Sequence, residues 1–219
     1  MNIAEQALTY VRDGQALGLG TGRAATAFVE ALGQRVQAGL QVRGVPTSQA
    51  TADLASQLGI PLTTLADVAE LEIAFDGADE VDPQLQLIKG YGGALVREKI
   101  VAASAKLFIV LVGPEKLVPV LGSHGKLPIE VVPFGVDLVR RRLQLLGLPA
   151  QVRPGPQGPF ITDNGNLILD ASIKPLLDSA ALEPQLRSIP GVVGTGLFLG
   201  MADVVLIQHP DRVDVRKRP

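Results

Sequence analysis

The sequence predicts an α/β protein: a doubly wound, Rossmann-like parallel sheet domain with an inserted smaller α+β domain. Short apolar runs alternate with segments of helical periodicity over residues 15–112, which is the pattern of successive βαβ units with right-handed crossovers. After Lys126 the pattern changes to shorter elements separated by Pro- and Gly-rich turns. We therefore expect residues 1–126 and 203–219 to form the Rossmann-like domain and residues 127–202 to form the smaller domain.

Apolar spacing gives the elements of the first domain in order. Residues 15–20 (QALGLG) predict a strand that ends in glycines, and Phe28, Val29 and Leu32 fall on one face of the helix that follows. Thr47-Ser48 can cap the helix after the second strand, because a hydroxyl accepts a bond from the first turn. The predicted strands are 15–20, 40–45, 71–75 and 106–112, and the predicted helices are 24–38, 49–58 and 94–105.

The smaller domain contains a hairpin signal. Residues 163–166 read Asp-Asn-Gly-Asn between two short apolar runs, and Asn-Gly accepts the positive φ angles of a tight turn. The patch RPGPQGP at 153–159 predicts an irregular connection. The other predicted elements are strands at 129–132, 160–161, 167–169, 192–199 and 203–207 and helices at 135–146 and 175–189, with residues 202–208 returning to the main sheet.

Composition narrows the class of protein. Of 219 residues, 47% are hydrophobic, which can fill a core, and a formal net charge of −2 argues against a nucleic-acid or anionic-membrane surface. There is no cysteine, and His124 and His209 lie too far apart in sequence for metal-ligand spacing. The sequence has no apolar stretch of membrane-spanning length and no signal-peptide pattern at its start. We expect a cytoplasmic enzyme that binds neither nucleic acid nor membrane.

A glycine-rich segment, GLGTGR at 18–23, joins the first strand to the first long helix. Such loops let backbone N–H groups approach a phosphate at a helix N-terminus. A dinucleotide site would want an acid about 20 residues further on, where the sequence reads VRGVP (42–46) instead. Three interpretations stay open: a structural turn, a site for the phosphate of a small substrate, and a dinucleotide site.

An acidic cluster follows the third predicted strand, at Asp76, Asp79, Glu80 and Asp82. A solvated loop with a helix cap would explain such acids, and carboxylates are also ligands for Mg²⁺. A third interpretation is acid–base catalysis without a metal, because α/β sheets bind ligands at the carboxyl ends of their strands. Lys89, in a glycine-flanked loop, would then stabilise an oxyanion, and Glu98 in the next helix would act as a general base.

Several motifs occur in the same order as in a known family. They are Gly20-Thr21-Gly22, Thr47-Ser48, DGADEVD (76–82), KGYGGALVREK (89–99), GKLPIEVVP (125–133), TDNGN (162–166) and IPGVVGTGLF (189–198). On these residues the chain resembles the ribose-5-phosphate isomerase A family over nearly its whole length. The resemblance implies an isomerase of the pentose phosphate pathway that interconverts D-ribose 5-phosphate and D-ribulose 5-phosphate through an enediolate. It also implies no metal, no cofactor, and a homodimer or homotetramer.

The resemblance assigns roles by position. Glu98 resembles the base that moves a proton between C1 and C2, and Asp76 resembles the group that assists ring opening and hydroxyl proton transfer. Asp79 and Lys89 resemble the residues that hold and polarise the sugar oxygens, and Lys126 resembles a further lysine at the substrate site. The other substrate-binding residues that we predict are Gly20, Thr21, Gly22, Thr47, Ser48, Gly90 and Gly92.

Two places depart from the family pattern. The loop that usually reads Gly-Thr-Gly-Ser-Thr has Arg23 and Ala24 in place of two hydroxyl residues, and Tyr91 interrupts what is usually a glycine run. Arg23 would supply a charge-assisted contact to the phosphate instead. Two alternative functions are an NADP-dependent oxidoreductase, in which Arg43 binds the 2′-phosphate, and a non-catalytic sugar-phosphate sensor.

Overall fold

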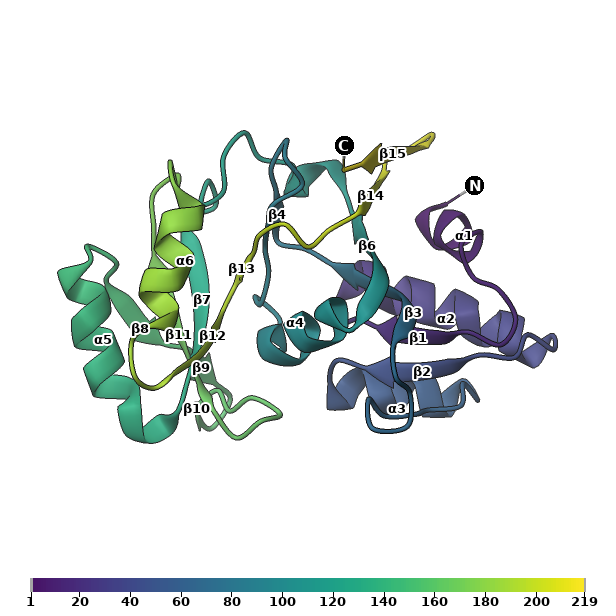
Figure 1. Ribbon diagram of the computed structural model, residues 1–219, viewed down its shortest axis with the longest axis horizontal. Coiled ribbons are helices and arrows are strands. Elements are labelled where there is room, and N and C mark those ends of the chain that lie inside the picture. Colours follow the sequence, from purple (N-terminus) through teal and green to yellow (C-terminus); the bar gives the residue numbers. More distant parts are fainter. Residues whose placement is uncertain (1, 219) are drawn as a thin grey trace. The chain divides into compact units, whose positions relative to one another are not determined.

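The computed structural model describes residues 2–218, and its contacts divide the chain into two compact units. Unit 1 contains the chain through Ala78, Arg97–Lys116 and the chain from Met201 onward, and unit 2 contains Asp79–Val96 and Leu117–Gly200. Figure 1 labels their helices and strands. The predicted fold class is confirmed, because unit 1 carries a mostly parallel Rossmann-like sheet and unit 2 is a smaller α+β arrangement.

The two units differ from the predicted domain ranges in three segments. The sequence places residues 79–96 and 117–126 in the Rossmann-like domain, whereas the contacts place them in unit 2, and it places residues 201–202 in the smaller domain, whereas the contacts place them in unit 1. For residues 79–96 the reason is strand pairing: β4 (Glu80–Val81) pairs antiparallel with β5 (Leu87–Ile88), which pairs with β13 (Leu197–Phe198). Strands of two residues are too short to show a periodic pattern in the sequence.

Within residues 2–218, unit 1 is built on a six-stranded sheet in the order β15-β14-β6-β3-β1-β2. Neighbouring strands are parallel except for β14 and β15, which pair antiparallel at the edge. The predicted return of residues 202–208 to this sheet is confirmed. The strands are β1 (Ala16–Leu19), β2 (Arg43–Pro46), β3 (Leu71–Gly77), β6 (Ala105–Val112), β14 (Val204–Gln208) and β15 (Val213–Lys217).

Helices cover both faces of this sheet. On β1, Leu17 and Leu19 belong to a buried core that includes Phe28 of α2. Successive side chains of a strand point to opposite faces, and a side chain at Gly18 would lie 2.5 Å from Val101 of α4. The helices are α1 (Ile3–Leu8), α2 (Arg23–Gln37), α3 (Gln49–Gln57) and α4 (Leu95–Ala103). The helices α2 and α4 therefore pack on opposite faces, as a doubly wound sheet requires.

Unit 2 contains a four-stranded antiparallel sheet in the order β12-β7-β11-β8, counted over the described residues. Its helices α5 and α6 pack beside this sheet around buried side chains such as Ile129, Val139 and Leu186 (Figure 1). The elements are β7 (Lys126–Val131), α5 (Val136–Leu145), β8 (Ala150–Val152), β9 (Pro154–Gly155), β10 (Gly158–Pro159), β11 (Leu167–Ser172), α6 (Ser179–Arg187) and β12 (Val192–Thr195). Short 3-10 helices lie at Pro133–Gly135 in this unit and at Pro114–Lys116 in unit 1.

The predicted strand 192–199 is divided in the structure. Its first part, β12, pairs with β7, and its second part, β13, pairs with β5. Gly196 lies between the two parts, where its N–H donates to Pro128 O (2.7 Å) and its carbonyl oxygen accepts from Lys89 N (2.9 Å). A single residue thus joins the two small sheets of unit 2, and it fixes the backbone of Lys89.

Candidate active site

In unit 1, Asp76 lies on the inner strand β3 against the glycine loop. A Cβ atom on Gly20 would stand 2.4 Å from the carboxyl carbon of Asp76, so this approach requires a glycine. The Oδ1 atom of Asp76 accepts from the N–H groups of Thr21 (3.1 Å) and Gly77 (2.7 Å). The loop thereby fixes a carboxylate that is 2% exposed at the carboxyl end of the strand, where α/β sheets bind ligands.

A cluster of hydroxyl groups lies beside the same loop. Thr21 Oγ1 lies 2.8 Å from Thr47 Oγ1, 2.9 Å from Ser48 Oγ and 3.2 Å from Thr51 Oγ1. Ser48 caps α3, which confirms the predicted cap, and Thr51 Oγ1 donates to Gly20 O at 3.0 Å. The structure therefore brings together three predicted residues and adds Thr51, whose only sequence signal is its position in the first turn of the capped helix. Hydroxyl groups both donate and accept, so this cluster suits a hydroxylated or anionic ligand.

The start of α2 combines Gly22 with Arg23. Gly22 is the N-cap residue, with a φ of 97°. It has no side chain to cap the helix, whose first N–H groups and partial positive charge favour an anion. The Arg23 side chain is 92% exposed and forms an ion pair with Glu115 at 3.3 Å. Arg23 thus extends into solvent beside an acid of the same unit, and its contact with a phosphate stays a prediction.

Glu98 lies in the first turn of α4 and is 5% exposed. Carboxylates are rarely buried on helices, because removing the charge from water is costly unless other groups compensate for it. Glu98 is therefore not the solvated residue that an isolated glutamate on a helix would usually be. Its burial is typical of groups that take part in binding or catalysis.

Two acids of the sequence cluster support the fold of unit 2. Glu80 is fully buried, and its carboxylate accepts from two backbone N–H groups of the turn at 122–124, each at 2.6 Å. Asp82 Oδ1 accepts from two N–H groups of residues 84–86, at 2.9 and 2.8 Å. Burial raises the pKa of Asp82, and these backbone bonds oppose the rise. These bonds fix two turns of unit 2, so we assign Glu80 and Asp82 a structural role.

Lys89 follows β5 in unit 2 and is 2% exposed. Its N–H donates to Gly196 O at 2.9 Å, and its Nζ atom lies 5.5 Å from the centroid of the Phe198 ring. In the loop that follows, the N–H of Tyr91 donates to Asp79 Oδ2 at 2.9 Å. A buried ammonium on a fixed backbone is a suitable donor to an oxyanion, because it does not reorganise during the reaction.

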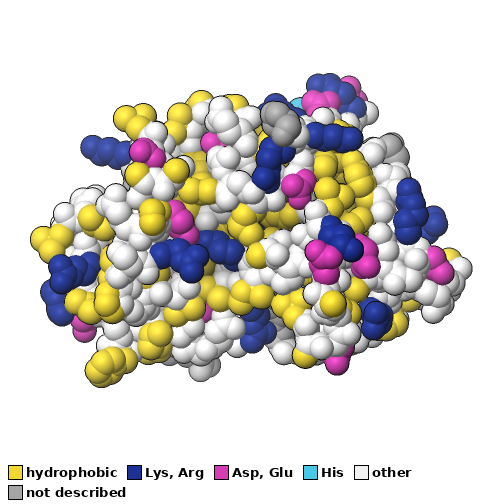
Figure 2. All heavy atoms as spheres, in the orientation of Figure 1, with side chains coloured by type: hydrophobic (Ala, Val, Ile, Leu, Met, Phe, Trp, Pro, Cys, Tyr) yellow, Lys and Arg dark blue, Asp and Glu magenta, His cyan; other side chains and the backbone are white. Residues whose placement is uncertain are grey.

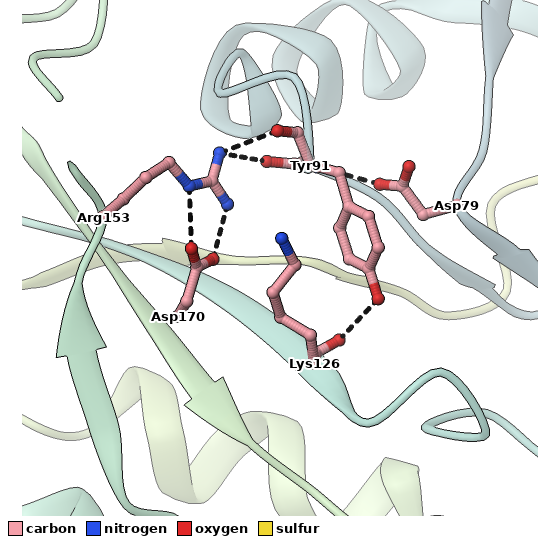
Figure 3. A network of polar contacts seen from close by, with 6 residues as sticks. Asp79, Tyr91, Lys126, Arg153 and Asp170 are labelled. Carbon is pink, nitrogen blue, oxygen red and sulfur yellow. Dashed lines mark hydrogen bonds and ion pairs between the residues drawn. The ribbon is translucent and has the colours of Figure 1, made fainter. Parts of the chain in front are cut away.

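Tyr91 lies between Asp79 and Lys126 (Figure 3). Its phenol donates to Lys126 O at 3.2 Å, and Lys126 Nζ lies 4.0 Å from the ring centroid, within cation–π range. Burial raises the pKa of the Tyr91 phenol, and the charges of Glu80, Asp79 and Asp170 raise it further. The phenol therefore stays protonated and holds Lys126, a contact that a glycine at this position lacks.

Sequence reasoning missed Arg153 and Asp170. Arg153 Nε donates to Asp170 Oδ2 at 2.9 Å and Nη2 donates to Oδ1 at 2.5 Å, a bidentate pair (Figure 3). Arg153 Nη1 donates to the carbonyl oxygens of Gly90 (3.0 Å) and Tyr91 (2.9 Å). In the sequence, Arg153 opens the patch 153–159, which predicts only an irregular connection. An arginine among prolines and glycines is the single signal that was available.

The predicted site residues form two groups, one in each unit. Unit 1 holds Asp76, Glu98, Thr47, Ser48 and residues 20–23, and unit 2 holds Asp79, Lys89, Gly90, Gly92 and Lys126. Over residues 2–218, no three His, Cys, Asp or Glu side chains are grouped so that they could hold a metal ion. In the same part of the chain, every helix is too short or too polar to span a bilayer. Both groups combine carboxylates with hydrogen-bond donors, which suits proton transfer on a polar molecule.

Known proteins have sequences similar to this one. A family model described as Ribose 5-phosphate isomerase A (phosphoriboisomerase A) matches residues 43–212. Ribose-5-phosphate isomerase A of Roseiflexus sp. (strain RS-1) is 52% identical over 213 residues, which cover 96% of this chain and 91% of that protein. The protein of the same name from Sinorhizobium fredii (strain NBRC 101917 / NGR234) is 49% identical, with 95% of this chain and 92% of that protein covered.

Solved structures share the fold. Ribose 5-phosphate isomerase A of Methanocaldococcus jannaschii is similar with a TM-score of 0.94 and 43% identity, covering 99% of this chain and 96% of that chain. A D-ribose-5-phosphate isomerase in complex with phospho-erythronic acid has a TM-score of 0.95 and 40% identity, covering 98% of this chain and 96% of that chain. The similarity therefore extends over both units.

Proposed function

The chain belongs to the ribose 5-phosphate isomerase A family, and we propose that it interconverts D-ribose 5-phosphate and D-ribulose 5-phosphate through an enediolate, without a metal or an organic cofactor. The observation that carries the proposal is the burial of three charged groups at predicted site positions: Asp76, Glu98 and Lys89. Buried charges are uncommon unless they are paired or serve a function.

The reaction needs a base for carbon and a second group for oxygen. In the open-chain aldose, Glu98 removes the C2 proton, and the electron pair forms the C1–C2 double bond while negative charge develops on O1. Glu98 then returns the proton to C1, O1 gains a proton, and the hydroxyl at C2 loses its proton to become the ketone. Asp76 would assist ring opening and carry the hydroxyl protons, so no atom is gained or lost overall.

The developing charge on oxygen needs hydrogen-bond donors. Lys89 is proposed to donate to this oxygen, because a buried ammonium is a stronger electrostatic partner than one in water. Asp79 would accept a hydrogen bond from a sugar hydroxyl, and Lys126 would contribute positive charge at the substrate site. Gly90 and Gly92 would let the substrate approach the backbone of the loop.

The phosphate is proposed to lie at the glycine loop of unit 1. The first N–H groups of α2, after Gly22, and the hydroxyl cluster of Thr21, Thr47 and Ser48 offer donors there. Gly20 would shape this loop by allowing the close approach of Asp76. Arg23 would break its ion pair with Glu115 and donate to the phosphate as well.

Arg23→Ala is expected to raise KM for ribose 5-phosphate by about 3- to 10-fold, with kcat nearly unchanged. The effect is smaller than for a buried contact because the side chain is exposed and screened by water. A loss of binding that is equal in the ground and transition states changes KM alone. Steady-state kinetics give both constants. The control is Glu115→Gln, which keeps Arg23 but removes the acid that it pairs with. An unchanged KM in Arg23→Ala would mean that backbone amides and hydroxyls hold the phosphate without it.

A coupled assay for ribulose 5-phosphate, run with and without a chelator such as EDTA, tests the proposed function. We expect turnover of ribose 5-phosphate and equal rates in both conditions. Loss of activity in chelator, restored by Mg²⁺ or Mn²⁺, would reject the metal-free reaction. No turnover by the folded protein in either condition would favour the non-catalytic sensor.

The geometry does not favour the NADP-dependent alternative. Arg43 begins β2 and pairs in register with Ala16, at the amino end of β1. The glycine loop follows Leu19 at the carboxyl end, so Arg43 lies roughly 10 Å away along the strands, at about 3.3 Å per residue. A dinucleotide on the loop would meet residue 47 at the end of β2 instead. Nicotinamide cofactor binding, measured by calorimetry, should be absent.

We further propose a cytoplasmic homodimer or homotetramer. Figure 2 shows hydrophobic side chains on the surface over the part of unit 2 that Figure 1 labels α5. Phe134 is fully exposed and Leu145 is 79% exposed, which is unusual for a monomer and typical of an interface. The charged substrate does not cross membranes unaided, so the enzyme is placed with it in the cytoplasm. Light scattering would give two or four times the chain mass of 23.0 kDa, and a single chain mass would contradict the proposal.

A further inference from the structure

We propose that Arg153, oriented by Asp170, is a positioning residue that holds the loop after β5 so that Lys89 stands where the enediolate forms. This inference rests on the proposed function, in which Lys89 stabilises the charged intermediate. Arg153 would touch no reacting atom and would act through the backbone of the loop. Neither residue belongs to the motifs that mark the family resemblance in the sequence.

The guanidinium of Arg153 is buried, and each of its nitrogens donates a hydrogen bond. Arg153 is 8% exposed, and two of its nitrogens donate to the carboxylate of Asp170, at 2.9 and 2.5 Å. The third, Nη1, donates to the carbonyl oxygens of Gly90 and Tyr91, at 3.0 and 2.9 Å (Figure 3). Burying a charge is costly, and Asp170 compensates for this cost while it fixes the plane of the guanidinium group.

The loop needs such a partner because of its backbone conformation. Gly90 has a φ of +101° and Gly93 a φ of +94°, in the region that favours glycine. This conformation turns two successive carbonyl oxygens toward the same nitrogen of Arg153. At Gly93, an added Cβ would stand 2.5 Å from the ring of Phe160, whose N–H donates to Arg153 O at 2.9 Å. The segment 153–160 therefore contacts the loop through both a charged and an aromatic side chain.

Lys89 is held at consecutive peptide groups. Its own N–H donates to Gly196 O, and the carbonyl oxygens of the next two residues, Gly90 and Tyr91, accept from Arg153. The N–H of Tyr91 donates to Asp79 Oδ2 at 2.9 Å. If Arg153 is removed, the anchor at Gly196 remains, but the peptides that follow Lys89 lose two hydrogen bonds. The lysine side chain would then lose its fixed direction, while unit 2 keeps its fold.

Lysine at position 153 is the sharpest substitution. It keeps the positive charge near Asp170, but its single nitrogen on a flexible stem cannot hold the carboxylate with two bonds and both carbonyl oxygens at once. The substitution therefore retains the positive charge but removes the planar guanidinium group. Arg140→Lys is the matched control, because Arg140 is an exposed arginine of the same unit that pairs only with Asp137 among the ion pairs described.

The test measures kcat and KM for ribose 5-phosphate and the inhibition constant of phospho-erythronic acid, whose planar carboxylate resembles the enediolate. For Arg153→Lys we expect kcat to fall by about 10- to 100-fold, because small misplacements of catalytic groups are costly. We expect KM to stay within about threefold, the inhibition constant to rise together with the loss in kcat, and the melting temperature to stay close to the parent. Arg140→Lys should match the parent in all four.

Two outcomes would overturn the inference. One is a kcat of Arg153→Lys within twofold of the parent. The other comes from the double variant: if Arg153→Lys lowers kcat in the Lys89→Met background as much as it does in the parent, Arg153 does not act through Lys89. A residue that acts through Lys89 has no further effect once Lys89 is gone. If Arg153→Lys does not fold, Asp170→Asn takes its place in the same measurements. Failure of the proposed function would look different, because the parent enzyme itself would then not turn over ribose 5-phosphate.

Discussion

Replacing Glu98 with glutamine is expected to lower kcat by about 10²–10⁴-fold, the usual contribution of a general base. Glutamine keeps the size and hydrogen bonding of the side chain but cannot accept the C2 proton. Substrate should still bind, so KM should change little. Steady-state kinetics in the coupled assay measure both constants.

Glu70→Gln is the matched control for this substitution. Glu70 lies in the same unit, but it is about half exposed and pairs with Lys106 on the surface, so its loss should leave kcat unchanged. Thermal unfolding of both variants separates a loss of chemistry from a loss of fold. If Glu98→Gln retains the parent kcat, Glu98 is not the base, and Asp79 becomes the next candidate.

Lys89→Ala is expected to lower kcat by about 10²–10³-fold, the effect of removing one donor to an oxyanion. Without the ammonium, the charge on the enediolate oxygen has a weaker partner, so the transition state rises in energy more than the bound substrate does. The inhibition constant of phospho-erythronic acid should rise with it, which kinetics in the presence of the inhibitor measure.

An exposed lysine of unit 2, Lys174, supplies the control for Lys89. Lys174→Ala removes the same charge from the unit and should leave both constants unchanged. A Lys89→Ala variant that loses substrate affinity but keeps kcat would show that the lysine binds the ground state and transition state equally. Its role would then be substrate binding rather than stabilisation of the intermediate.

Much of the fold follows from the sequence, because the inner strands are short, mostly buried apolar runs. The strand β3 and the helix α2 occur where apolar spacing predicts them, and β14 returns to the main sheet as expected. The helix α1 and the strands β4 and β5 were not predicted, because elements of two to six residues show no period. These short strands also explain why residues 79–96 pack in unit 2.

The candidate site was predicted in part. Asp76 could be placed because the end of an inner strand and a glycine loop are both visible in the sequence. Glu80 and Asp82 could not be separated from Asp76, since only the structure shows that they hold the backbone of unit 2, whereas Asp76 lies against the glycine loop of unit 1. The pair of Arg153 and Asp170 could not be found either, because it joins residues whose connection depends on strand pairing between β8 and β11.

The most direct test of the proposed function is the isotope content of the product formed in D₂O with EDTA present. Proton NMR of ribulose 5-phosphate made by the parent enzyme reports whether deuterium from solvent enters at C1. Proton transfer through an enediolate with Glu98 as the base predicts deuterium at C1 of the product, at a rate unaffected by EDTA and strongly reduced in Glu98→Gln. Product that carries only hydrogen at C1 even after long incubation at equilibrium, when the enediolate has formed many times, would indicate a direct hydride shift between C2 and C1 and would contradict the proposal.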